Sequence, residues 1–93
     1  MDLPDKNILL KANYIVNQRA EEKERQYGPF SEGMERAAMI AKGATGKDIT
    51  PEDVYMILVA LKLSRHSYKY KEDNLLDAVA YLGALDNYIK GEV

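Results

Sequence analysis

Apolar residues recur every three or four positions from Lys71 to Ile89, which is the repeat of an amphipathic helix. One side of this helix is wholly apolar and carries Leu75, Ala78, Val79, Leu82, Leu85 and Ile89. The opposite side begins with two acids and continues with small and aromatic residues, namely Asp73, Asp77, Ala80, Tyr81, Ala84 and Tyr88. A helix that is apolar on two sides is normally contacted on both. We therefore expect this helix to be the element around which the chain folds.

Two helices are predicted in the first half of the chain. The first begins after Asp5 and runs to about Tyr27, where Gly28 and Pro29 end it. The second spans Glu32 to Lys42, with Ser31 as its N-cap. The glycine-containing stretch 43–49 then reads as a loop.

A third helix is predicted to begin at Thr50 and Pro51, because a hydroxyl cap followed by proline and two acids is typical of a helix start. It runs to about His66 and has almost no polar side, so we expect it to be the most buried element. Its residues Tyr55, Leu58 and Leu61 are expected to pack against Leu75, Val79 and Leu82. With no alternating strand pattern, the sequence predicts an all-α four-helix bundle forming a single domain over residues 1–93.

Composition narrows the class of protein. Of 93 residues, 46% are hydrophobic and 30% are charged, as in a folded soluble protein. The net charge of −2 argues against general nucleic-acid binding and against binding to an anionic membrane. There is no cysteine and no signal-peptide pattern. We expect a cytoplasmic protein. Because so small a core is marginal, we also expect a homo-oligomer.

Acidic residues suggest a metal site. Asp73 and Asp77 lie one turn apart on one helix, and Glu21, Glu22 and Glu24 lie on another. Together they could bind Mg²⁺, which prefers oxygen ligands and takes the rest of its shell from water and phosphate. Two alternatives remain open: the glutamates form solvated ion pairs, and Asp77 forms a salt bridge with a cation of the third helix.

A basic and aromatic stretch covers the end of the third predicted helix and the connection that follows it. It comprises Lys62, Arg65, His66, Tyr68, Lys69, Tyr70 and Lys71, without an acid among them. Cations beside aromatic rings suit phosphates and stacked bases. The alternative is a solvated connecting loop.

Five segments occur in an order that is typical of a known group: residues 25–28, 34–38, 48–54, 61–65 and 73–81. In these segments the chain resembles small phage and prophage proteins that are themselves similar to MazG-type all-α nucleotide pyrophosphohydrolases. The resemblance covers roughly residues 20–88. It implies a MazG-like helical fold, frequent oligomerisation and, in the enzymes, a Mg²⁺ site facing a nucleoside triphosphate.

The resemblance also implies roles for individual acids. Asp77 matches the final acid of the enzymes' E-x-x-D segment, and Asp73 falls one position off that spacing. The first helix reads Glu21-Glu22-Lys23-Glu24 where the enzymes have E-E-x-x-E. The implied metal ligands are Glu21, Glu24, Asp73 and Asp77.

The same resemblance implies a nucleotide pocket. In it Lys62, Arg65 and Lys69 would contact phosphates, and Tyr27 or Tyr81 would form a wall. Two functions follow from these residues. One is Mg²⁺-dependent cleavage of a nucleoside triphosphate between its α and β phosphates, with Glu24, Asp73 and Asp77 as the catalytic acids. The alternative is a non-catalytic phage anti-defence protein, which sequesters a nucleotide signal or binds a host defence protein.

Overall fold

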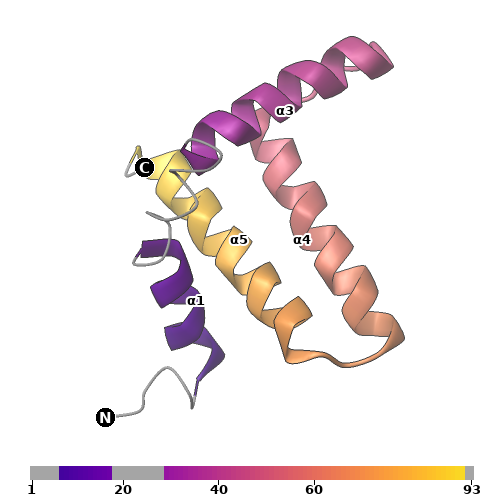
Figure 1. Ribbon diagram of the computed structural model, residues 1–93. Helices are drawn as coiled ribbons and strands as arrows, with labels where there is room; N and C mark the ends of the chain where they lie inside the picture. Colours follow the sequence, from indigo (N-terminus) through magenta and orange to yellow (C-terminus); the bar gives the residue numbers. More distant parts are fainter. Residues whose placement is uncertain (1–6, 18–28, 92–93) are drawn as a thin grey trace.

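The computed structural model describes residues 7–17 and 29–91, and these residues form helices without any strand. The described helices are α1 (Ile8–Asn17), α3 (Phe30–Thr45), α4 (Pro51–Tyr68) and α5 (Glu72–Lys90) (Figure 1). The all-α prediction is confirmed, and the described helices pack together. The predicted end of the first helix, near Tyr27, lies outside the described residues.

The last helix occupies the centre, as predicted. Figure 1 shows α5 between α1 and α4, with α3 crossing one end of α4. The packing follows that picture: α5 contacts both α1 and α4, and α3 contacts chiefly α4. The two apolar sides of α5 thus correspond to its two neighbours, α1 and α4.

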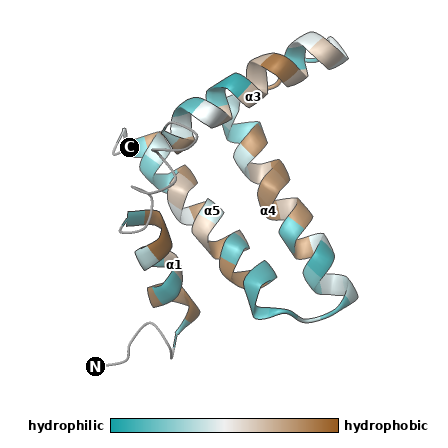
Figure 2. Cartoon of the chain, in the orientation of Figure 1, coloured by the Kyte–Doolittle hydropathy of each residue, from teal (hydrophilic) through white to brown (hydrophobic). Residues whose placement is uncertain are grey.

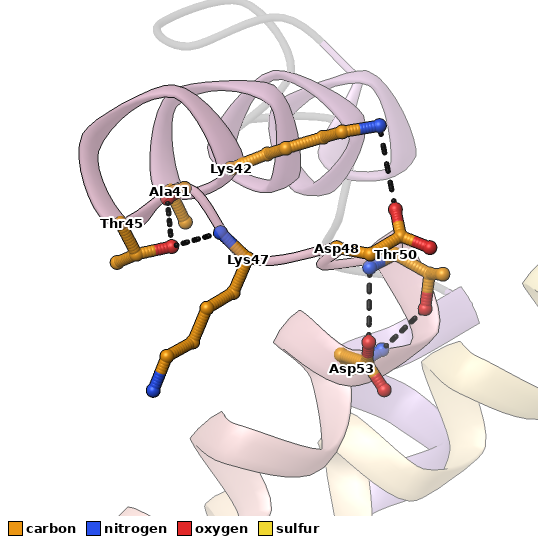
Figure 3. Close-up of polar contacts among 7 residues, drawn as sticks. All are labelled: Ala41, Lys42, Thr45, Lys47, Asp48, Thr50 and Asp53. Carbon is orange, nitrogen blue, oxygen red and sulfur yellow. Dashed lines mark hydrogen bonds and ion pairs between the residues drawn. The ribbon is translucent and has the colours of Figure 1, made fainter.

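The start of α4 is fixed by the capping box that the sequence predicts. The Thr50 amide donates to Asp53 Oδ2 at 2.9 Å, and the Asp53 amide donates to Thr50 Oγ1 at 3.2 Å (Figure 3). Pro51 follows at the first helical position, where its missing N–H costs nothing. Just before the cap, Gly46 adopts φ 71° and its amide donates to the Lys42 carbonyl, which ends α3.

Thr50→Ala is expected to lower the free energy of unfolding by about 1 kcal/mol, because the Asp53 amide loses its hydroxyl acceptor while the backbone amide of residue 50 keeps the Asp53 carboxylate. Thr50→Ser keeps the hydroxyl and is expected to stay within about 0.5 kcal/mol of the parent. Urea denaturation followed by circular dichroism measures both. Equal losses in the two variants would contradict the capping role.

The predicted limits of α3 are wrong. The helix begins at Phe30 rather than Glu32, so that Ser31 lies inside the first turn and Pro29 occupies the cap position. It also continues through Gly43 to Thr45, because Gly46 and not Gly43 takes up the left-handed conformation that ends a helix. The limits of α5 agree with the prediction to within one residue, and α4 extends two residues further than predicted, to Tyr68.

The prediction that α4 is the most buried element is also wrong. Only Tyr55 and Val59 of α4 are buried, and Leu61 is 45% exposed. α5 covers α4 along one side and α3 adds cover near its start, so the apolar residues on its other sides face outward. Within residues 7–17 and 29–91, four of the six buried apolar residues are alanines: the buried set is Ala12, Ala38, Tyr55, Val59, Ala78 and Ala80. The core therefore depends on close helix approach and on one large side chain.

The predicted contacts between α4 and α5 are corrected in the same way. Tyr55 meets α5 through Tyr88, and Lys62 meets it through Asp77. Val79 instead lines a cavity against α1, and Leu82 is 45% exposed. The side of α5 that faces α4 is thus the one with acids and tyrosines.

Candidate functional site

The candidate site is the seam between α4 and α5, where one side of each helix meets the other. Tyr55, Val59 and Lys62 recur at helical spacing on α4, and they face the acidic and aromatic side of α5. Tyr55 lies beside Tyr88 and Lys62 beside Asp77, so the two helices run antiparallel. Most of the residues that the sequence singles out within the described range are brought to this seam or to its end.

One end of the seam is an aromatic cluster of Phe30, Tyr55, Tyr81 and Tyr88. Phe30 stacks on Tyr81 with ring centroids 6.0 Å apart and an interplanar angle of 14°. Its edge meets Tyr55 at 5.7 Å, and Tyr55 lies 5.5 Å from Tyr88. These separations are those of attractive ring pairs. The cluster joins the start of α3 to the seam.

Both inner tyrosines of this cluster hold their protons strongly. Burial raises the pKa of Tyr55 to about 12, and the neighbouring Tyr88 and Glu35 contribute further. Desolvation raises the pKa of Tyr88 as well, assisted by Glu35, to whose Oε2 the Tyr88 hydroxyl donates at 3.2 Å. Tyr55 Oη is buried and has no hydrogen-bond partner among the described residues. The cluster is therefore uncharged at neutral pH.

The middle of the seam is an ion pair. Lys62 Nζ lies 3.0 Å from Asp77 Oδ2, and the side chains are 17% and 40% exposed respectively. The sequence leaves open whether Asp77 binds Mg²⁺ or forms a salt bridge with a cation of the third helix. In the structure Asp77 forms a salt bridge with Lys62. Asp77 and Tyr81 are one turn apart on α5, so the pair borders the aromatic cluster.

The other end of the seam is cationic. Arg65 and Lys69 are exposed, and neither has an ion pair to an acid within the part of the chain that the structure describes. His66, between them in the sequence, has a buried Nδ1 without a hydrogen-bond partner among the described residues, and its ring lies 5.9 Å from that of Tyr70 in an edge-on arrangement. Asp73 is exposed in the first turn of α5. This end can accept an anion with little rearrangement.

The predicted metal ligands fall into two groups. Asp73 and Asp77 are described, and no three His, Asp or Glu side chains of residues 7–17 and 29–91 converge into a group that could hold a metal ion. Glu21, Glu22, Glu24 and Tyr27 lie outside the described residues. The Mg²⁺ site and the Tyr27 wall therefore stay predictions.

A cavity of about 240 Å³ lies on the other side of α5, against α1. Apolar residues such as Val16 and Val79 line one part of it, and three asparagines and Asp86 line another. Asn17 Nδ2 donates to Asn13 Oδ1 at 2.6 Å, and Asn87 Nδ2 donates to Asn17 Oδ1 at 3.3 Å. Because these amides already bond to one another, they serve to hold α1 on α5.

Two residues of the seam were missed in the sequence. Phe30 lies before the predicted start of its helix, and Glu35 gives no local signal that it reaches Tyr88. Neither residue carries a local signal, because each contact joins segments that are far apart in the sequence.

Comparison with known proteins finds a matching family model and a similar phage protein. Residues 7–89 match the family model described as Domain of unknown function (DUF6378). The chain is 35% identical over 83 residues to the Gene 55 protein of Mycobacterium phage L5, covering 86% of this chain and 51% of that protein. It thus spans about half the length of this curated relative. No solved structure matches the chain. Among the described residues, no helix is long and apolar enough to cross a membrane.

Proposed function

The chain belongs to the DUF6378 family, and we propose that it is a phage protein that binds a phosphorylated nucleotide at the α4–α5 seam. The observation that carries the proposal is the order of groups along the seam: stacked rings, then the Lys62–Asp77 pair, then exposed cations. Aromatic faces stack on bases, and lysine and arginine bind phosphate oxygens. The resemblance to MazG-type enzymes supports the same class of ligand.

Each part of the seam has a role in this proposal. Arg65 and Lys69, the exposed cations, contact the phosphates. Lys62 is held by Asp77 one turn from Tyr81, so it lies between the phosphate end and the rings. Phe30, 39% exposed, offers a ring edge or face to the base.

Asp73 and Asp77, which are one turn apart on α5, are the proposed ligands of Mg²⁺. Two carboxylates suffice for Mg²⁺ when phosphates and water complete its shell. When bound, the ion would neutralise phosphate charge. Hydrolysis would need further acids, and Glu21 and Glu24 are the candidates. Binding without hydrolysis, which removes a nucleotide signal from host defence, needs only the residues of the seam, and we propose it as the function.

The test is a panel of nucleoside mono-, di- and triphosphates in a thermal-shift assay with and without Mg²⁺, followed by titration calorimetry. A ligand of the folded state raises the melting temperature. Arg65→Ala and Lys69→Ala are each expected to weaken binding about tenfold, which corresponds to about 1.4 kcal/mol. Lys47→Ala removes an exposed cation at the opposite end of α4 and should leave the affinity unchanged.

The proposal fails if no nucleotide in the panel shifts the melting temperature, or if Lys47→Ala weakens binding as much as Lys69→Ala. Release of pyrophosphate from a triphosphate that binds would establish hydrolysis in addition to binding.

A further inference from the structure

Two exposed tyrosines lie at the cationic end of the seam. Tyr68 is the last residue of α4 and Tyr70 lies in the connection to α5, and they are 92% and 63% exposed respectively. Figure 1 shows this connection at the end of the α4–α5 pair that lies away from α3, and Figure 2 shows it in hydrophilic colour, in contrast to the middle of α4. An exposed aromatic ring offers a face on which a base can stack. The function proposed above uses neither ring.

Of these two rings, that of Tyr70 is held at the seam. Its centroid lies 5.9 Å from that of the His66 ring, at an interplanar angle of 80°. His66 follows Lys62 by one turn on the side of α4 that faces α5, and its Nδ1 is buried. A ring that is already held in position loses little conformational freedom when a base stacks on it. Tyr70 is therefore the better stacking position of the two.

The chain around Tyr70 carries positive charge only. Residues 54–71 contain no acid, and their charged side chains at neutral pH are Lys62, Arg65, Lys69 and Lys71. Lys69 and Lys71 are exposed and directly adjoin Tyr70 in the sequence. Cations that flank a ring attract the phosphates of a base that stacks on it. The surroundings of Tyr70 thus suit a base that is attached to phosphate.

Aromatic rings therefore lie at both ends of the seam, and cations lie between them. Phe30 is at one end and Tyr70 at the other. Their ring neighbours on α4, Tyr55 and His66, are eleven residues apart, which corresponds to about 16 Å along a helix. Neighbouring bases stacked in one strand are only about 3.4 Å apart. The two ring positions suit two bases that are held well apart by phosphates.

We propose that the nucleotide bound at the seam is a dinucleotide, with one base on Phe30, the other on Tyr70, and its phosphates on Arg65 and Lys69. This inference rests on the proposed function and adds the class of ligand to it. A mononucleotide fills only one of the ring positions. The separation of the rings favours two nucleosides joined 5′ to 5′ through several phosphates over a 3′–5′ dinucleotide, in which a single phosphate joins the nucleosides.

Titration calorimetry with matched ligands tests the class. Two adenosines joined 5′ to 5′ through three phosphates are expected to bind about tenfold more tightly than adenosine triphosphate, because one more base stacks on a ring. Two adenosines joined 3′ to 5′ through one phosphate should show no such gain over adenosine monophosphate. A gain with the 3′–5′ ligand alone would overturn the 5′–5′ linkage and the base separation from which it is inferred.

Variants of Tyr70 test the second ring position itself. Tyr70→Ala is expected to remove the tenfold gain and to leave the affinity for adenosine triphosphate unchanged, whereas Tyr70→Phe keeps the ring and should keep the gain. Tyr14→Ala removes a tyrosine of α1 that is also exposed and should change neither affinity.

The outcomes separate this inference from the proposed function. If adenosine triphosphate binds but the 5′–5′ dinucleotide binds no more tightly, or if Tyr70→Ala weakens both ligands equally, the second ring position is wrong and nucleotide binding at the seam stands. If neither a mononucleotide nor a dinucleotide binds, both proposals are wrong.

Discussion

Tyr55→Ala is expected to lower the free energy of unfolding by about 3–5 kcal/mol, the range for deleting a buried aromatic side chain. Tyr55 is 0% exposed and is the largest fully buried side chain. Its ring contacts Phe30 of α3 and Tyr88 of α5, so its loss removes packing contacts between α4 and both of these helices. Its ring neighbours Phe30 and Tyr88 belong to other helices, so the structure is expected to close the resulting cavity only in part. Denaturant unfolding monitored by circular dichroism measures the change, and a loss below about 1 kcal/mol would contradict a core role for this ring.

Tyr55→Phe keeps the ring and removes the hydroxyl, so it measures the contribution of the hydroxyl alone. Tyr55 Oη is buried without a partner within the described residues, so removing it is expected to leave stability unchanged or to raise it slightly. The raised pKa gives an independent check. In the folded protein the pKa of Tyr55 is raised to about 12, whereas a tyrosine of the unfolded chain has a pKa of about 10. The parent should therefore lose stability between these two pH values, and Tyr55→Phe should lose less. Identical alkaline profiles for the two proteins would contradict the assigned burial.

Much of the fold could be predicted because helix signals in this chain are local. The cap at Thr50 and the two apolar sides of α5 depend on residues within a few turns, and the structure confirms both. The end of α3 could not be predicted from glycine alone. Gly43 and Gly46 are both chemically able to end a helix, and only the path of the chain toward α4 decides which one takes the left-handed conformation.

Burial could not be predicted from hydrophobicity because it depends on which neighbours a helix has. Leu61 and Leu82 have the pattern of core residues, yet each is 45% exposed, since α4 and α5 meet through the side that carries Asp77 and Tyr88. The apolar residues of α4 that made it look central face outward, because only α5 and the start of α3 cover this helix among the described residues. Periodicity shows that a surface needs cover, but it does not show whether the same chain supplies it.

The candidate site was predictable where charges lie close in the sequence. The cationic end of α4 precedes the acids of α5 by a short connection, which is enough to expect Lys62 or Arg65 beside Asp77. The structure selects Lys62, because it lies on the same side of α4 as Tyr55 and Val59. The contribution of α3 through Phe30 and Glu35 is long-range and left no pattern in the sequence.

The Lys62–Asp77 pair gives the second large expected effect, and the effect should differ between its two members. Asp77→Asn leaves the lysine ammonium, only 17% exposed, without a carboxylate, and should lower the free energy of unfolding by about 1–3 kcal/mol. Lys62→Met keeps the packing of the stem and leaves a carboxylate that is 40% exposed and can be hydrated, so the loss should stay below about 1 kcal/mol.

The double variant Asp77→Asn/Lys62→Met completes the cycle and should be more stable than Asp77→Asn alone, because no buried ammonium remains unpaired. A loss from Lys62→Met as large as that from Asp77→Asn would contradict this asymmetry.

The same variants test whether Asp77 has only a structural role or also takes part in ligand binding. If the only role of Asp77 is its ion pair with Lys62, the double variant recovers stability and binds nucleotide with the same Mg²⁺ dependence as the parent. If Asp77 also holds Mg²⁺ against a phosphate, the double variant recovers stability but loses that dependence, because a neutral amide cannot replace the carboxylate ligand.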